Sequence, residues 1–292
     1  SAFLFTVLRI NIMDSSQLFG LAMIAYIIAS ALYIGYLLFK ARTLGVLGTL
    51  TTACGTVLLA AAIGLRWHES YQLGTGHAPL TNMYESLVFF SLCTSILYLF
   101  LERRYAMRSL GAFTLPLIAI SMAYASFSSR IDDSISPLIP ALQSNWLIAH
   151  VVTCFIGYGA FALAAALGGM YLIKQAFPAA KGDEAGKLPD LSTLDDLIHK
   201  TLIFGFIWLS AGIITGSVWA NEAWGTYWSW DPKETWSIIT WFLYALTLHA
   251  RFTRGWNGNR IAWLSIAGFF AVLITYFGVN FFLAGLHSYG AS

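Results

Sequence analysis

Apolar residues in this chain gather into eight long runs that are separated by shorter polar connections. Each run is close to the roughly 20 residues that an α-helix needs to cross the hydrocarbon core of a bilayer. The pattern therefore predicts an all-α integral membrane protein, with about eight transmembrane helices in one polytopic domain that covers residues 1–292. The expected spans are 18–39, 44–65, 84–101, 109–127, 146–173, 201–220, 237–254 and 261–283.

The composition of the chain supports this class. Hydrophobic residues make up 58% of the 292 residues and charged residues only 10%, whereas soluble domains carry about 25% charged residues. The formal net charge of +2 gives no reason to expect nucleic-acid binding. Membrane lipid is therefore the first partner that the sequence implies.

Basic residues are divided unevenly between two alternating sets of connections. Twelve of the sixteen Lys and Arg residues fall in one set and four in the other. Because cytoplasmic loops carry the excess of Lys and Arg, the first set is expected in the cytoplasm, or in the stroma of a plastid. Both termini and the segment 221–236 are then outside, and the membrane is a bacterial inner membrane or a thylakoid membrane. Residues 1–12, ahead of Met13, are expected to be an extension or a fusion remnant.

The segment between the sixth and seventh spans reads WGTYWSWDPKETW, from Trp224 to Trp236. Charges are costly at the bilayer centre, and apolar patches of this size are rarely left exposed. The segment therefore predicts an outer surface that a flat, apolar molecule covers. Its Asp231-Pro232 pair predicts an N-cap and the first turn of a short helix.

Three of the six histidines fall where they could hold a ligand. His150 and His287 approach the outer surface from opposite ends of the chain, and His249 lies about 20 Å below Trp236 at 1.5 Å per residue. Two neutral imidazoles across an aromatic surface would suit a six-coordinate haem iron. A hydrogen-bonded core histidine, a b-type cytochrome and a haem-free or quinone-linked structural subunit stay open. The side chains expected to be loop residues or interfacial anchors are His68, His77, Trp146, Trp208 and Trp219.

The three cysteines, Cys54, Cys93 and Cys154, all fall within apolar spans. The sequence contains neither CxxC nor CxxCH. Core thiols are therefore expected, because free cysteine is among the most buried residue types. Any covalent chemistry that needs a pair of thiols must draw them from another protein.

The Trp-rich motif resembles the WWD signature of the CcsA (ResC-type) family, which belongs to the system II pathway of cytochrome c biogenesis. The outer sequence GHAPLTNMYES and the closing GLHSYG are similar to that family as well. The resemblance implies that the chain carries or receives haem b across the membrane and presents it outside. There the haem would be joined through thioether bonds to the CxxCH motif of an apocytochrome c.

The same resemblance implies a set of partners and site residues. A CcsB-type membrane subunit would complete a holocytochrome c synthase, and thiol-reducing proteins would serve it. A haem exporter or chaperone without synthase activity is the alternative, so an enzymatic role for this chain alone stays open. His150 and His287 match the outer haem-iron ligands and His249 matches a transmembrane one. The haem-contacting residues implied by the motif are Trp224, Gly225, Trp228, Trp230, Asp231 and Trp236.

Overall fold

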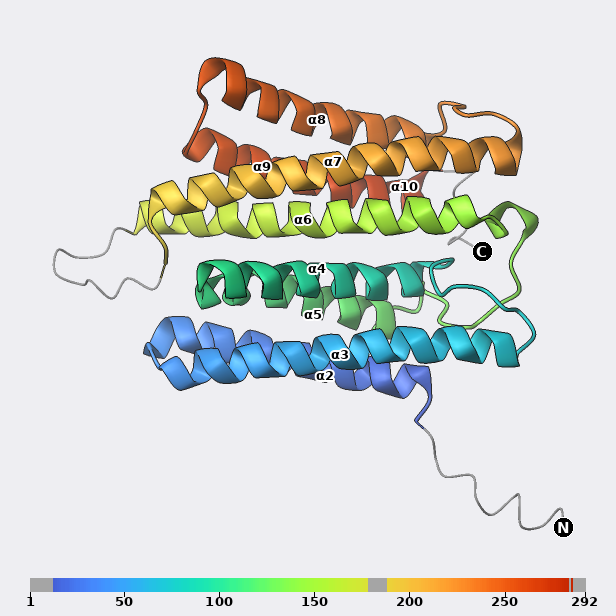
Figure 1. Ribbon diagram of the computed structural model, residues 1–292, viewed down its shortest axis with the longest axis horizontal. Coiled ribbons are helices and arrows are strands. Elements are labelled where there is room, and N and C mark those ends of the chain that lie inside the picture. The colour runs from blue at the N-terminus through green and yellow to red at the C-terminus, as the bar shows by residue number, and fades with distance from the viewer. Residues whose placement is uncertain (1–12, 178–187, 284, 286–292) are drawn as a thin grey trace, which may run out of the picture.

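Long antiparallel helices run side by side in the computed structural model, which describes residues 13–177, 188–283 and 285 (Figure 1). No strand occurs among these described residues. The helices are α2 (Ser15–Phe39), α3 (Arg42–Gln72), α4 (Met83–Tyr105), α5 (Gly111–Phe127), α6 (Asn145–Ala176), α7 (Leu191–Trp224), α8 (Pro232–Arg254), α9 (Asn259–Leu273) and α10 (Val279–Phe282). Short 3₁₀ turns cover Arg108–Leu110 and Pro140–Leu142, and a π-helix covers Ile274–Gly278.

Each of the eight predicted spans coincides with one of these long helices, so the all-α multi-pass class is confirmed. Seven helical segments in the described part of the chain are long and apolar enough to cross a membrane. Helix α8 is not among the seven, although it has 23 residues and lies alongside the others (Figure 1). Thr, Trp, His and Arg side chains interrupt its apolar residues and lower its hydropathy.

The helix predicted to begin at Pro232 and to lead into the seventh span is present, and it is the first part of a longer helix. Helix α8 starts at Pro232 and continues without a break to Arg254. Asp231 is its N-cap, and the side chain accepts a hydrogen bond from the Lys233 N–H at 2.9 Å. Glu234 completes a capping box, which satisfies the free N–H groups of the first turn. The prediction of Asp231 as N-cap is confirmed.

Helix α7 is longer than predicted, because it extends to Trp224 instead of ending near residue 220. It ends at Gly225, whose φ of 77° is readily accessible only to glycine. Only residues 225–231 therefore separate α7 from α8. This segment is called the Trp loop below.

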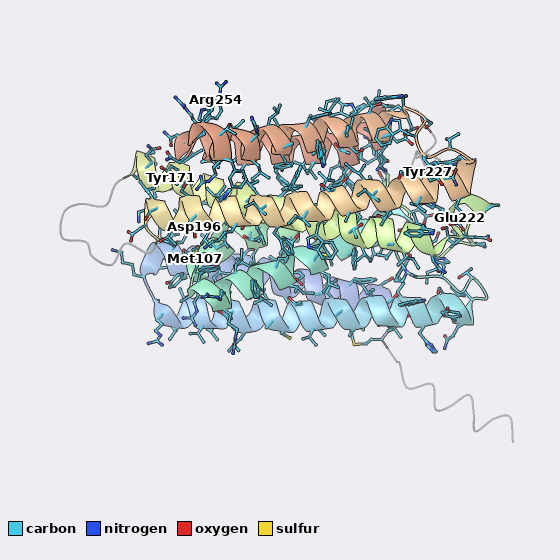
Figure 2. All side chains as sticks on the ribbon, turned by 45° about the horizontal axis from the view of Figure 1, so that its top comes forward. Met107, Tyr171, Asp196, Glu222, Tyr227 and Arg254 are labelled. Carbon is cyan, nitrogen blue, oxygen red and sulfur yellow. The ribbon has the colours of Figure 1, made fainter. Side chains whose placement is uncertain are left out.

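The Trp loop shares one end of the bundle with the connections after α3 and after α5 (Figure 1). This end is called the Trp end, and the opposite one the basic end. Figure 2 shows Glu222 and Tyr227 at the Trp end, and Asp196 and Arg254 at the basic end. The Trp-rich segment and the GHAPLTNMYES segment, which are far apart in the sequence, therefore lie at the same end of the structure. Residues 1–12, residues 178–187 and His287 lie outside the described residues.

Helix α6 is the central element of the bundle, and its most extensive packing is against α7. Glycines set the closeness of this pair. A Cβ on Gly157 would lie 3.1 Å from the backbone nitrogen of Leu209, and one on Gly212 would lie 2.5 Å from the Cys154 sulfur. Small residues at helix contacts let backbones approach closely inside membranes. The two helices are thus fixed in register just where His150 projects between them.

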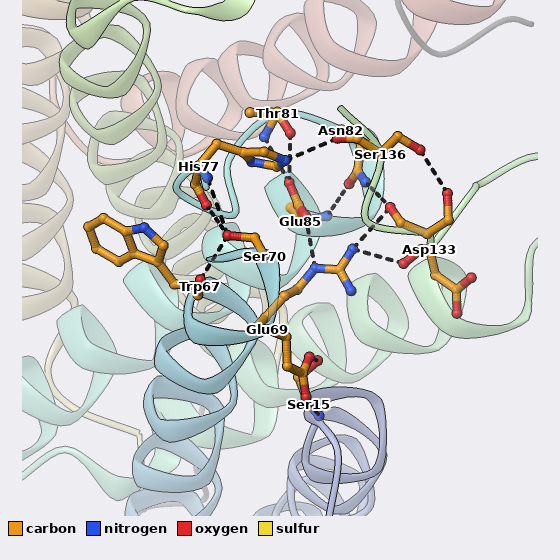
Figure 3. Close-up of polar contacts among 12 residues, drawn as sticks. Ser15, Trp67, Glu69, Ser70, His77, Thr81, Asn82, Glu85, Asp133 and Ser136 are labelled. Carbon is orange, nitrogen blue, oxygen red and sulfur yellow. Dashed lines mark hydrogen bonds and ion pairs between the residues drawn. The ribbon is translucent and has the colours of Figure 1, made fainter. Parts of the chain in front are cut away.

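A buried ion pair ties together the connections of the Trp end (Figure 3). Arg66 of α3 meets Glu85 of α4 at 2.8 Å, and its guanidinium also donates to the Asp133 carbonyl at 2.8 Å. The other Glu85 oxygen accepts from the backbone N–H of Thr81 at 2.9 Å. Two helices and two loops therefore depend on one charge pair.

Glu85→Gln should lower the free energy of unfolding by about 3–5 kcal/mol, because it leaves the Arg66 cation buried without its counter-charge. Equilibrium denaturation in detergent would measure this loss. Asp196→Asn, which breaks an exposed i, i+4 pair with Lys200, is the control and should change stability little. Equal effects of the two substitutions would contradict the proposed role of the buried pair.

Candidate functional site

His150 is held in one orientation by a backbone carbonyl of the neighbouring helix. It lies near the start of α6, and its Nδ1 is 2.8 Å from the Gly212 oxygen of α7. A carbonyl can only accept, so Nδ1 carries the proton and donates. In the neutral ring the lone pair then belongs to Nε2, which is the arrangement that metal-binding histidines use.

Trp219 packs against one face of the His150 ring. The two rings stack with centroids 5.8 Å apart and planes 17° from parallel. Trp219 is only 3% exposed, and its indole N–H donates to the Ala141 carbonyl at 2.8 Å. The expectation that Trp219 is an interfacial anchor was therefore wrong. The sequence around Trp219 contained no signal that its side chain would face α6. Trp146, in contrast, is exposed as expected.

Gly216 makes room for the imidazole from the α7 side. A Cβ at this position would lie 2.5 Å from Nδ1 of His150, closer than real Cβ contacts come. The lack of a side chain at Gly216, the Gly212 carbonyl and the Trp219 ring together restrict the imidazole to one orientation. The ring is therefore preorganised by backbone and aromatic contacts, which do not depend on mobile surface groups.

A small cavity opens beside His150, between α6, α7, α8 and the Trp loop. Its volume is about 60 Å³, and its aromatic lining comes from Tyr158, Tyr227 and Trp228. Lys233 also lines it, and the ammonium donates to the Asn280 side chain at 2.9 Å. The cavity therefore joins an imidazole, aromatic faces and a cation, which are groups suited to a flat, anionic, metal-bearing molecule.

The Trp loop is shaped by one buried carboxylate. A single Glu234 oxygen accepts from the backbone N–H groups of Ser229, at 2.8 Å, and Asp231, at 3.2 Å. Between them Trp230 has a φ of 60° and is 71% exposed. A bulky residue in this left-handed region is strained. The hydrogen bonds to Glu234 thus stabilise the backbone on both sides of Trp230, which keeps its exposed side chain in an unfavourable left-handed conformation.

The motif tryptophans have different surroundings. Trp224 packs against Trp219 with ring centroids 4.9 Å apart, and Trp228 meets Trp230 edge-on at 5.7 Å. Trp228 lines the His150 cavity, whereas Trp236 belongs to α8, where its carbonyl accepts from Thr275 at 3.2 Å. Gly225 ends α7, as described above. Of the four motif tryptophans, Trp228 therefore lines the cavity, and the other three lie in the structure around it.

The other candidate ligands stand apart from His150. His249 is exposed on α8, near the basic end. His287 lies outside the described residues. No group of three or more potential metal-binding side chains occurs in the part of the chain that the structure describes. Within that part, His150 is the candidate ligand that lines an aromatic cavity.

Two further expectations about side chains need correction. Cys54 is exposed, although it lies in an apolar span, because a membrane helix also has a face that points away from the protein core. Cys93 and Cys154 are buried as expected. His77 is also buried, with its ring nitrogens 3.1 Å from the carbonyls of Ala78 and Ser136. His77 is thus a loop residue as expected and joins two loops, whereas the placement of His68 in the loop was wrong, because α3 continues through it to Gln72.

Comparison with known proteins identifies the family. Residues 80–287 match the sequence model of the Cytochrome C assembly protein family. The cytochrome c biogenesis protein CcsA of Trieres chinensis is 36% identical over 95% of this chain and 96% of its own length. CcsA of Gloeobacter violaceus is 37% identical over 95% of this chain and 98% of its own. This chain belongs to the CcsA-type cytochrome c biogenesis proteins.

The resemblance seen in the motifs is thus confirmed, and the CcsA-type chain functions in cytochrome c biogenesis. Its fold also resembles a solved structure, the cytochrome c haem lyase CcmF, with a TM-score of 0.68 and 18% sequence identity. The match covers 92% of this chain and 48% of CcmF. At that identity the likeness establishes a shared fold only.

Gly216→Ala should destabilise the protein by about 1–3 kcal/mol, because the added methyl group overlaps the His150 ring and must push α6 and α7 apart. Denaturation in detergent would measure the change. Gly64→Ala is the matched control, since nothing lies within 4 Å of that position on α3. It should stabilise the helix by roughly 0.5–1 kcal/mol. If Gly216→Ala were as well tolerated as Gly64→Ala, the ring would not be confined as described.

Proposed function

We propose that this chain binds haem b at the Trp end, with Nε2 of His150 as one axial ligand of the iron. It would present the haem for thioether attachment to the CxxCH motif of an apocytochrome c. The observation that carries the proposal is the fixed His150 ring, whose Nδ1 is engaged by the Gly212 carbonyl beside an aromatic cavity. An imidazole with its tautomer set in this way needs no rearrangement to bind a metal.

The side chains around the cavity suit haem, but the present space does not. A volume of about 60 Å³ is far below the roughly 300–1,000 Å³ of cofactor-sized sites. Tyr227 and Trp228 of the Trp loop close the cavity. Haem binding therefore requires this loop to move outward, so that the aromatic rings come to lie on the porphyrin instead of on one another.

Four side chains would complete the binding site. Lys233 would exchange its Asn280 partner for a haem propionate, because it already lines the cavity with a donor group. Asp231 and Glu234 would shape the turn that carries Trp228 and Trp230. The second axial ligand would be His287, as the family resemblance implies. The exposed motif rings would then cover the porphyrin together with the incoming peptide.

The covalent chemistry lies largely in the haem vinyl groups and the thiols of the substrate protein. Adding two thiols across two vinyl groups needs both pairs in register, and holding them there is an effect of proximity. The role of His150, Lys233 and the Trp loop is therefore to orient the haem. The thiols would come from the apocytochrome, kept reduced by partner proteins.

The position of His249 supports a site shared with another subunit. The side chain is exposed on α8, so a ligand there would need a second protein to cover it. A CcsB-type subunit would supply that cover in the complete synthase. The Trp end would face outward, as the charge bias predicts, from a bacterial inner membrane or a thylakoid membrane.

His150→Ala should abolish the low-spin, bis-histidine absorption spectrum of the haem that copurifies with the complex, because one axial nitrogen is lost. The spectrum and the haem content per protein would be measured after purification with the partner subunit. His68→Ala is the control: this exposed α3 residue, whose ring nitrogen lies 3.0 Å from the Gln72 amide, does not line the His150 cavity and should leave the spectrum unchanged. An unaltered spectrum and haem content in His150→Ala would remove it as a ligand. Maturation of a co-expressed CxxCH protein would separate a synthase from an exporter.

His249→Ala should deplete haem at the Trp end in cells if haem arrives along α8, and haem added to the purified complex should restore the spectrum. Spectra before and after haem addition would measure this. Full loading of the variant in cells, with no haem added, would exclude His249 from the delivery route while leaving the role of His150 intact.

A further inference from the structure

A large polar groove lies at the Trp end, separate from the His150 cavity. Its volume is about 770 Å³, within the range of sites that take a sizeable ligand. One wall comes from the end of α3 and the loop after it, and the other from residues 137–148. Glu222, in the last turn of α7, lines it as well. None of the roles assigned above uses this groove.

We infer that the groove binds an extended, Lys- or Arg-bearing segment of polypeptide, and that this segment is the part of the substrate protein next to its CxxCH motif. The inference rests on the proposed function for the identity of the substrate. The groove itself supplies the chemistry that selects a cationic chain.

Charge complementarity is the first argument. Glu222 brings a carboxylate to the groove, and one of its oxygens accepts from the Ser144 hydroxyl at 2.6 Å. Within the described residues no Lys, Arg or His forms an ion pair with it. His77 also lines the groove, but its two ring nitrogens already face carbonyl oxygens. The lining therefore offers an anionic group without a matching cation.

Exposed aromatic side chains are the second argument. Trp67, Tyr71 and Trp146 line the groove and are each exposed over more than a third of their surface. Tryptophan and tyrosine dominate binding hot spots, and their faces attract ammonium and guanidinium groups. Exposed aromatic rings and a carboxylate in one groove are thus suited to an extended segment with a basic side chain.

Position is the third argument, and it favours the substrate over any other basic polypeptide. Trp219 links the groove to the His150 cavity, because it donates to the Ala141 carbonyl beside the groove and stacks on the His150 ring. Glu222 follows Trp219 by three residues on α7, so both lie on one face of the helix. Figure 2 shows Glu222 and Tyr227 at the same end of the bundle. A chain held in the groove would therefore deliver its next few residues to the mouth of the cavity.

The test measures peptide binding to the full chain in lipid nanodiscs without haem. The probe is a fluorescent peptide that carries the CxxCH sequence with serine in place of both cysteines, flanked by lysines. A second peptide has alanine in place of the lysines. Glu222→Gln should weaken binding of the lysine peptide about threefold, as expected for an exposed ion pair, and leave the alanine peptide unchanged. Trp146→Ala should weaken binding of the lysine peptide about tenfold.

Matched controls separate this site from general effects. Asp132→Asn removes a carboxylate from the same end but outside the groove, and Trp263→Ala removes an exposed tryptophan from near the start of α9. Neither should change binding. The inference is overturned if Asp132→Asn and Glu222→Gln act equally, which would indicate nonspecific charge attraction. It is also overturned if Trp146→Ala has no effect, which would make this ring a membrane anchor only.

The outcome is independent of haem ligation. Peptide binding that depends on Glu222 would support the groove even if His150→Ala left the haem spectrum unchanged. Conversely, a bis-histidine spectrum with no Glu222-dependent binding would keep the proposed function and reject the groove. A lysine-independent affinity that Glu222→Gln does not change would assign the groove to a different partner segment.

Discussion

The close approach of α6 and α7 is the constraint on which the site depends. Glycines at 157, 205, 212 and 216 remove the side chains that would hold these helices apart. Inside a membrane the hydrophobic effect does not press helices together, so close van der Waals packing must do so. The same approach brings the Gly212 carbonyl within hydrogen-bonding distance of His150. Packing and ligand geometry are therefore set by one interface.

This arrangement explains how a histidine can be held in one orientation between two apolar helices. A buried imidazole with an unmet N–H would cost free energy, and a rotating one would lose its alignment with the metal. The backbone acceptor on α7 satisfies the N–H, and Trp219 holds the ring plane. Neither contact involves a charged group, so both persist where charges are expensive.

The helices of the bundle could largely be predicted from the sequence, because a continuous run of about 20 apolar residues is enough to indicate a membrane-spanning helix. The α8 cap was readable for the same reason, since Asp231-Pro232 is a two-residue signal. The burial of Trp219 and the Arg66–Glu85 ion pair could not be predicted from the sequence. Each depends on which helix face meets which neighbour, and a chain of almost uniform hydropathy does not encode that in any short pattern. The exposure of Cys54 was missed for the same reason.

The Trp loop combines a firm hold with a strained residue, and the proposed function gives this combination a reason. Glu234 fixes the backbone on both sides of Trp230, whose left-handed conformation costs on the order of 1–3 kcal/mol. The cavity that the loop lines is too small for a porphyrin, so the proposed haem binding would require the loop to open. Relief of the strain at Trp230 on opening would offset part of the cost of separating Trp228 from its neighbours. Gly225, which already has a φ of 77° at the end of α7, is where the backbone can turn with the least resistance.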